Sequence, residues 1–195
     1  DDFARSFFAR SAMYPSVHPY ERSDVIAALN SVYAHDWDAF FRERIDRPGR
    51  PAPIAGIEMA GYRLVWKNRP NPYEAGRMDH HRQLDLSYSL GLTVDGDGDV
   101  SDPIWDGPAF RAGIVTGMEI VAVDTLAFTM DGLKLALERA KQDKRPIQLL
   151  VRRGNRYSTV PVPYYDGLRW PWLEPAEPAR EAALDRLLAS RSARP

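Results

Sequence analysis

The sequence contains no cysteine among its 195 residues. Disulfide bonds and thiolate metal sites are therefore excluded, although this absence does not fix the compartment. No apolar run approaches the roughly 20 residues that a membrane-spanning helix needs, so we expect no membrane partner. The 26 lysine and arginine residues nearly balance 27 acidic residues, giving a net charge of −1. Overall charge thus favours neither nucleic acid nor an anionic membrane as a partner.

Motifs that would carry catalysis are also absent. The sequence has no H-E-x-x-H zinc motif, no G-x-S-x-G nucleophile turn and no phosphate-binding G-x-x-x-x-G-K-[ST] loop. Its histidines are His18, His35, His80 and His81. The adjacent pair cannot share one face of a helix, so we expect it to be exposed rather than metal-bound. The sequence therefore predicts no catalytic residue and no metal site in this segment.

Hydrophobic residues make up 44% of the chain, which is typical of a globular protein. The chain begins Asp1-Asp2-Phe3, without methionine or a leader, and Phe3 and Phe7 already have helical spacing. We expect a piece of a longer protein, whose targeting signal would lie upstream.

Residues 1–56 are predicted to be a small all-α segment. Apolar residues recur at helical spacing there, with Ser23 and Asp36 as candidate N-caps. The proline-rich residues 47–53 cannot continue a helix and mark a boundary. Beyond it we expect a strand at 62–67, a polar loop at 68–83 and a further strand at 84–88.

The run Asp95-Gly96-Asp97-Gly98-Asp99 has acidic residues at alternate positions, as an EF-hand loop does at its start. The match then fails, because Val100 replaces the turn glycine, Asp106 replaces the bidentate glutamate, and no helix precedes the run. We predict a solvated hairpin tip rather than a calcium site.

The best functional candidate is the turn Ser89-Leu90-Gly91-Leu92. A glycine between two leucines lets the backbone bend and point successive amides into one small space, which suits a carboxylate. The strand that follows could receive an extended peptide as an added strand. Downstream, the sequence predicts a strand at 114–123, a helix that Thr129 caps, a hairpin around 153–155 and a last short helix.

This order of elements resembles a PDZ domain over about residues 60–163. The residues that carry the likeness are the turn Ser89-Leu90-Gly91-Leu92, the run Gly107-Pro108-Ala109-Phe110-Arg111-Ala112-Gly113 and the run Gly117-Met118-Glu119-Ile120-Val121-Ala122-Val123. They look most like the bacterial protease-associated kind. The resemblance implies an α+β fold: a partly open β-barrel or sandwich with a groove-lining helix, preceded by the all-α segment and followed by a C-terminal helix. The expected domains are 1–56, 57–165 and 166–195.

The flanking segments are similar to the C-terminal part of glycyl aminopeptidase-type zinc metallopeptidases. The residues concerned are Asp1 to Phe8, Asp24 to Asn30, Asp36 to Ile45 and the closing Gly167-Leu168-Arg169-Trp170-Pro171-Trp172-Leu173. Tryptophan at 170 and 172 departs from the tyrosine and histidine of that family. The resemblance implies that zinc belongs to a catalytic domain outside this sequence, and that the parent protein is bacterial and either periplasmic or secreted.

The resemblance implies a non-catalytic segment that holds an extended peptide or a protein C-terminus, to position or regulate substrate. Ser89, Leu90, Gly91 and Leu92 would receive the carboxylate, Thr93 and Val94 would pair with the peptide, and Thr129, Leu133 and Ala136 would line the last pocket. The parent catalytic domain is the second expected partner.

Three alternatives stay open. The groove could be filled by residues 68–83 or by the tail after Tyr164, which would make the domain a packing module that braces the peptidase. The chain could be the PDZ region of a serine or intramembrane protease. It could also be an enzyme in its own right, although no nucleophile, base and orienting group can be assembled from its motifs.

Overall fold

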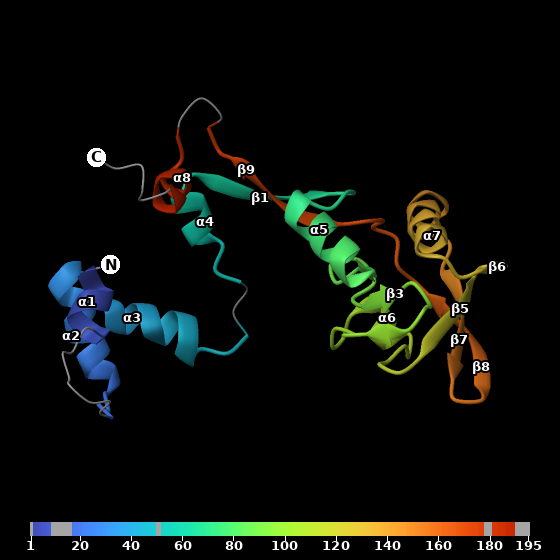
Figure 1. The fold of residues 1–195 in the computed structure, drawn as a ribbon, viewed down its shortest axis with the longest axis horizontal. Helices are drawn as coiled ribbons and strands as arrows, with labels where there is room; N and C mark the ends of the chain where they lie inside the picture. The colour runs from blue at the N-terminus through green and yellow to red at the C-terminus, as the bar shows by residue number, and fades with distance from the viewer. Residues whose placement is uncertain (1, 9–16, 50–51, 178–180, 190–195) are drawn as a thin grey trace. The chain divides into compact units, whose positions relative to one another are not determined.

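The computed structural model describes residues 2–8, 17–49, 52–177 and 181–189. Two compact units divide the chain, Asp1–Ala55 and Gly56–Pro195 (Figure 1). Among the described residues, no helix is both long enough and apolar enough to cross a membrane.

The first unit is helical, as predicted. Its elements are α1 (Asp2–Phe8), α2 (Arg22–Val32), α3 (Trp37–Phe41) and the π-helical turn η1 (Arg42–Asp46). The predicted cap at Asp36 is confirmed, because its carboxylate accepts a hydrogen bond from the Ala39 amide at 2.9 Å. The predicted cap at Ser23 is wrong, since α2 begins at Arg22 and its N-cap residue is Glu21.

Aromatic side chains contact one another in the first unit. Phe3 stacks on Phe7 with ring centroids 5.4 Å apart, and Phe7 meets Tyr20 at 5.2 Å. None of the described residues in α1, α2, α3 or η1 is buried. Burial is the main source of stability that aromatic residues offer. The expectation that the parent catalytic domain is a partner of this chain stays a prediction.

The second unit begins with a helix and a two-stranded ribbon. Helix α4 (Ala55–Met59) leads into β1 (Tyr62–Lys67), which pairs antiparallel with β9 (Trp170–Pro175) from the other end of the chain. The strand at 62–67 is thus confirmed. Helix α8 (Ala183–Leu188) closes onto the ribbon, where the Tyr62 hydroxyl donates to Asp185 Oδ1 at 2.6 Å.

A small three-stranded sheet follows. Its order is β2-β3-β4, and its elements with the preceding helix are α5 (Pro72–His81), β2 (Gln83–Asp85), β3 (Thr93–Asp95) and β4 (Val100–Ser101). The prediction of a loop over 68–83 is wrong. The Asn71 side chain accepts from the Glu74 amide at 2.9 Å, and Pro72 occupies the first turn, so a helix starts where we expected irregular chain.

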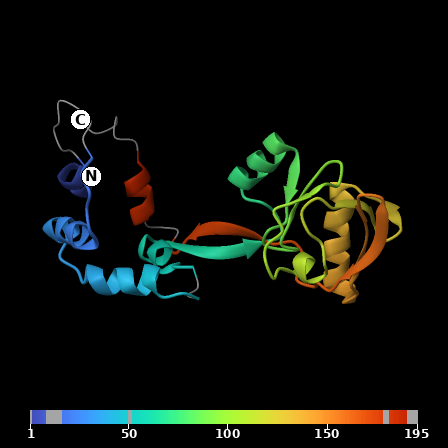
Figure 2. The same ribbon diagram turned by 90° about the horizontal axis from the view of Figure 1, so that it is seen from below.

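The largest sheet has the order β6-β5-β7-β8. Its elements and the two neighbouring helices are α6 (Pro108–Arg111), β5 (Glu119–Val123), β6 (Leu126–Ala127), α7 (Met130–Asp143), β7 (Ile147–Arg153) and β8 (Arg156–Val162). The hairpin of β7 and β8 is confirmed, whereas the strand expected from Ile114 begins only at Glu119. Helix α7 lies alongside this sheet (Figure 2).

The predicted hairpin tip at residues 95–99 is confirmed. Asp95 Oδ1 accepts hydrogen bonds from the Asp97 amide at 3.0 Å and the Asp99 amide at 2.9 Å. The carboxylate of Asp95 therefore stabilises the turn between β3 and β4 and is already engaged by the backbone.

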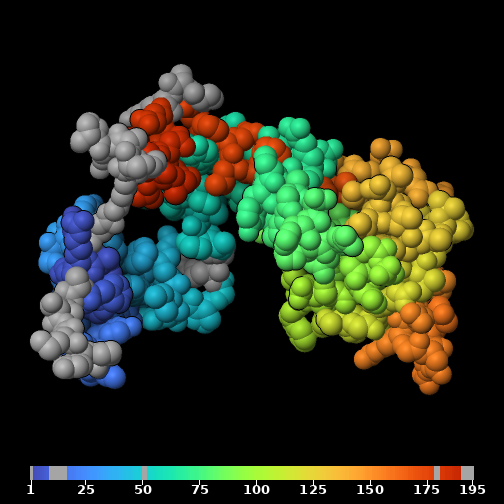
Figure 3. Space-filling view, in the orientation of Figure 1, coloured from blue at the N-terminus to red at the C-terminus, as the bar shows by residue number. Residues whose placement is uncertain are grey.

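One hydrophobic cluster joins the small sheet, the large sheet and α7. The α+β fold class is confirmed, with sheets of two, three and four strands and no closed barrel among the described residues. The PDZ-like assignment within that class stays a prediction. In the space-filling view, the tip of the β7–β8 hairpin protrudes from the second unit (orange, Figure 3).

Candidate functional site

The glycine turn after β2 brings three parts of the second unit together. Gly91 has φ of +77°, a conformation that favours glycine, and a Cβ there would be in van der Waals contact with the Gly107 Cα at 3.4 Å. The Gly91 carbonyl accepts from the Ile104 amide, and the Leu90 carbonyl accepts from the Ala109 amide, both at 2.8 Å. The turn is therefore fastened to the segment that leads into α6.

Two amides of the glycine turn already have an acceptor. Ser89 N–H and Gly91 N–H both donate to the Leu86 carbonyl, each at 2.9 Å. Leu86 N–H in turn donates to the Leu92 carbonyl at 2.9 Å. The Leu86 carbonyl thus engages Ser89 and Gly91, two of the four turn residues that were predicted to receive a carboxylate.

Strand β3 has a neighbour on each side. Thr93 and Val94 pair with Asp85 and Leu84 of β2, and on the opposite edge with β4. An added peptide strand along Thr93 and Val94 would have to displace one of these neighbours. Strand β2, which the chain itself supplies, therefore takes the position of an added strand.

The predicted site residues fall into two groups. Leu90, Leu92, Val94, Leu133 and Ala136 come together in one hydrophobic core. Ser89, Gly91 and Thr93 are buried beside them. Thr129 stands apart: it is exposed, and its hydroxyl caps α7 by accepting from the Gly132 amide at 2.9 Å, as predicted. Peptide binding by these residues stays a prediction.

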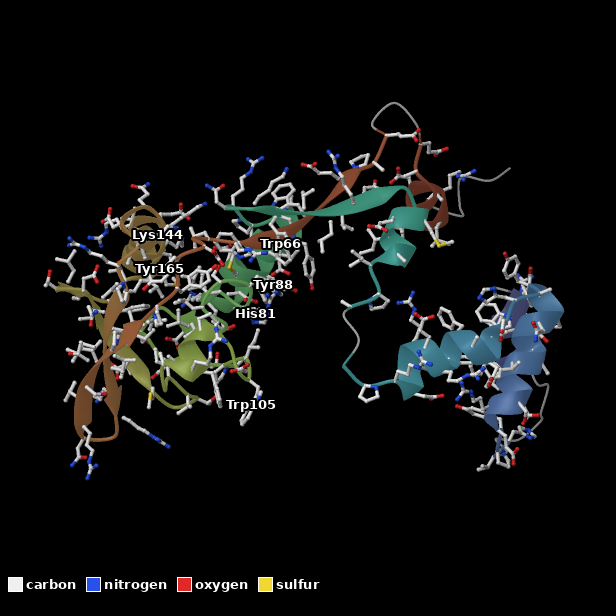
Figure 4. The ribbon with its side chains drawn as sticks, turned by 180° about the vertical axis from the view of Figure 1, so that it is seen from behind. Trp66, His81, Tyr88, Trp105, Lys144 and Tyr165 are labelled. Carbon is white, nitrogen blue, oxygen red and sulfur yellow. The ribbon has the colours of Figure 1, made fainter. Side chains whose placement is uncertain are left out.

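The tail after β8 runs along α7 and reaches the turn. Leu168 N–H donates to Glu138 Oε1 at 2.8 Å, and Arg169 N–H donates to the Ser89 hydroxyl at 3.1 Å. Gly167, with φ of +73°, approaches so closely that a side chain there would lie 2.7 Å from Lys141 Cδ. Figure 4 shows Tyr165 near Lys144, whose ammonium donates to the Tyr165 carbonyl at 3.4 Å.

Two aromatic residues anchor this tail. The Tyr164 hydroxyl donates to the Gly167 carbonyl at 2.8 Å, and burial raises the pKa of this phenol, so it stays protonated. The Trp170 indole N–H donates to the Asp85 carbonyl of β2 at 3.1 Å. The tail and β2 are therefore linked to each other as well as to the turn.

An ion-pair network fixes β2 to helix α5. The Arg77 guanidinium pairs with both Glu74 and Asp85, and the side chain of Asp85 is only 15% exposed. Burial raises the pKa of Asp85, but hydrogen bonds from Ser87 and Arg77 outweigh it, so the pKa lies below its usual value.

Replacing Asp85 with asparagine should therefore lower stability at pH 7 and matter less in acid. A carboxyl whose folded pKa is depressed stabilises fully above its unfolded pKa of about 3.9, and this contribution disappears as the pH falls through the folded value. Urea unfolding of wild type and Asp85→Asn at pH 7 and near pH 2.5 measures the difference. Asp97→Asn, on the exposed turn, is the matched control. A gap that is equally large at both pH values would contradict the assignment.

The sequence predicts neither a catalytic residue nor a metal site in this segment. No group of three or more metal-ligating side chains lies together among the described residues. His80 and His81 lie at the exposed end of α5, with ring centroids 5.0 Å apart.

Two elements of the second unit were not predicted from the sequence. Strand β9 was hidden because Pro171 and Pro175 argue against a strand, although alternation of Trp170 and Trp172 could have indicated one. Helix α5 was hidden by its polar composition, although Asn71-Pro72 is a recognisable helix start.

Comparison with known proteins gives a structural relation. No family model matches the sequence, and no curated protein matches it. An aminopeptidase N family protein from Idiomarina loihiensis, known from a crystal structure, is similar with a TM-score of 0.54 and 16% identity. The match covers 80% of this chain and 27% of that protein, so this chain corresponds to a minor part of its length. At this identity the likeness concerns the fold alone.

Proposed function

We propose that this chain is a non-catalytic part of a peptidase, in which a PDZ-like domain with a groove filled by its own chain braces the catalytic region. The observation that carries the proposal is the Leu86 carbonyl, which accepts from the Ser89 and Gly91 amides. Both amides belong to the turn that would receive the C-terminus of a peptide, and Gly91 is its central residue.

Displacing the resident chain would be costly. An incoming peptide would have to break the pairing of β2 with β3, and β2 is also held by the Arg77–Asp85 ion pair and by Trp170. Each hydrogen bond lost without replacement costs about 1 kcal/mol, and a short peptide starts from an affinity on the order of micromolar. This balance favours the packing role over peptide capture.

The proposal that this chain belongs to a peptidase is supported by similarity of fold. The similarity to part of an aminopeptidase N family protein supports this association over the PDZ region of a serine or intramembrane protease. An H-E-x-x-H motif is expected in the longer polypeptide that carries this chain, with zinc bound there. The periplasmic or secreted location of the bacterial parent follows from the resemblance in sequence.

The filled groove is tested by NMR titration of the full chain with an apolar-ended pentapeptide. The expected result is no saturable shift at the amides of Gly91 or Leu133, because the turn is occupied and Leu133 is buried. The same peptide with a C-terminal amide is the matched control.

Two outcomes would overturn the filled groove. Saturable shifts at Gly91 with the free acid, but not with the amide, would establish carboxylate capture at the turn. Loss of the Leu86–Gly91 hydrogen bond during titration, read from a rise in amide exchange at Gly91, would show that the resident chain gives way.

A further inference from the structure

A pocket of about 640 Å³ lies in the second unit. Its walls come from the end of β1, from α7 and from the tail between β8 and β9, and the residues that matter are Trp66, Lys67, Arg69, Lys141, Asp166 and Arg169. A volume of this size is typical of a site for a small ligand or for several side chains, for which about 300–1,000 Å³ is usual.

Positive charge dominates this pocket. Four of its lining residues are cations and one is a carboxylate, in a chain whose net charge is −1. Lys67 pairs with Glu174 at 2.8 Å. Arg69, Lys141 and Arg169 form no ion pair with any carboxylate in the described part of the chain. Three cations that line one pocket and pair with no carboxylate among the described residues repel each other, and an anionic ligand would relieve this repulsion.

Aromatic rings hold these cations in place. The Arg169 guanidinium lies 4.7 Å from the centre of the Trp66 ring, and Arg69 lies 5.2 Å from that of Trp172. The main chain is fixed too, because Arg169 N–H donates to the Ser89 hydroxyl and the Trp172 indole donates to the Arg69 carbonyl at 2.7 Å. Cations that are already oriented lose less entropy when a ligand binds.

An exposed aromatic surface borders the pocket. Trp66 is 41% exposed, and its ring centroid lies 5.1 Å from that of Tyr88, as the two labelled side chains in Figure 4 show. Such rings offer contact area for the aliphatic portion and the backbone of a peptide.

We propose that this pocket binds an acidic peptide segment through its side-chain carboxylates. Arg69 and Arg169 would each take a carboxylate, with Lys141 as a further point charge and the Trp66–Tyr88 surface beneath the peptide backbone. Three unpaired cations match two or three acidic side chains. A nucleic-acid site that neutralises roughly 6–10 phosphates uses more cations than the four that line this pocket.

The site is separate from the glycine turn. Its recognition groups are side chains, whereas the turn would use main-chain amides that already bind Leu86. Binding of an acidic peptide at the pocket is a role beyond packing. The pocket could fail to bind the peptide while the groove is filled, and the groove could be open while the pocket binds the peptide.

Binding is tested on the full chain by tryptophan fluorescence, with an N-acetylated and C-amidated heptapeptide that alternates glutamate with leucine. Its glutamine counterpart is the matched ligand control. We expect the acidic peptide to bind about tenfold more tightly, and to weaken severalfold when salt rises from about 50 to about 500 mM. Both peptides lack a free C-terminus, so the turn cannot contribute.

Two substitutions locate the site. Arg69→Gln should weaken binding of the acidic peptide by about fivefold or more, because one charge-assisted contact is lost. Arg153→Gln removes the same charge from the β7–β8 hairpin, outside the pocket, and should leave the affinity unchanged.

Three results would overturn the proposal. The first is equal affinity for the glutamate and glutamine peptides. The second is an equal loss of affinity for the acidic peptide in Arg69→Gln and Arg153→Gln. The third is tighter binding of a thymidine oligonucleotide than of the acidic peptide at the same salt concentration. The last result would mean that the pocket recognises phosphates instead of carboxylates.

Discussion

Replacing Leu133 with alanine should lower the free energy of unfolding by about 3 kcal/mol, the usual cost of emptying a closed core site. Leu133 is 0% exposed and packs in the cluster that also contains Leu90 and Leu92. The surrounding side chains come from α7 and from both sheets, so they cannot all move in to fill the cavity. Urea unfolding followed by circular dichroism measures the loss.

Leu135→Ala is the matched control, because Leu135 lies in the same helix and is 65% exposed. Leucine and alanine have similar helix propensities, so this change should cost less than about 0.5 kcal/mol. A comparably small loss for Leu133→Ala would mean that Leu133 faces an open groove, which would favour peptide binding over the packing role.

Replacing Gly98 with alanine should be at least as damaging, with an expected loss of about 3 kcal/mol or more. Gly98 has φ of +94°, and an added Cβ would lie 2.4 Å from the Ile120 carbonyl oxygen. The Gly98 carbonyl also accepts from the Ile120 amide at 2.8 Å, so the backbone cannot move away without breaking the contact with β5. The same unfolding measurement applies.

Gly96→Ala, two residues earlier in the same turn, is the control. A Cβ at Gly96 would have no neighbour within 4 Å, and Gly96 does not have a positive φ. The change should be nearly neutral or slightly stabilising, since alanine restricts the unfolded chain more than glycine does. Equal effects at the two glycines would show that the turn is not held against β5.

In the packing role that we propose, the second unit uses its own chain to cover the edge of β3. Strands β2 and β4 pair with β3 on its two edges, and an unpaired strand edge is a known aggregation hazard. The pocket that we propose for acidic peptides lies outside this groove and is lined by Arg69, Lys141 and Arg169. A domain of this kind could contact its partner through side chains while its core stays closed.

Local elements were well predicted from the sequence where periodicity and turn residues agree. The β7–β8 hairpin, α7 with its Thr129 cap, and the Asp95 turn all depend on residues close together in the chain. Helix α5 and strand β9 escaped prediction because proline and polar residues masked their patterns.

The sequence by itself determined the α+β class, the glycine turn and the absence of a recognisable catalytic motif. Only the tertiary structure decided which distant segments pack against the turn and against β2. The bonds from Arg169 to Ser89 and from Trp170 to Asp85 join residues 80 and 85 positions apart. No local pattern of hydrophobicity specifies such pairs, since they form only when separate elements share one core. The same long-range packing brings Trp66, Lys141 and Arg169 together into a charged pocket.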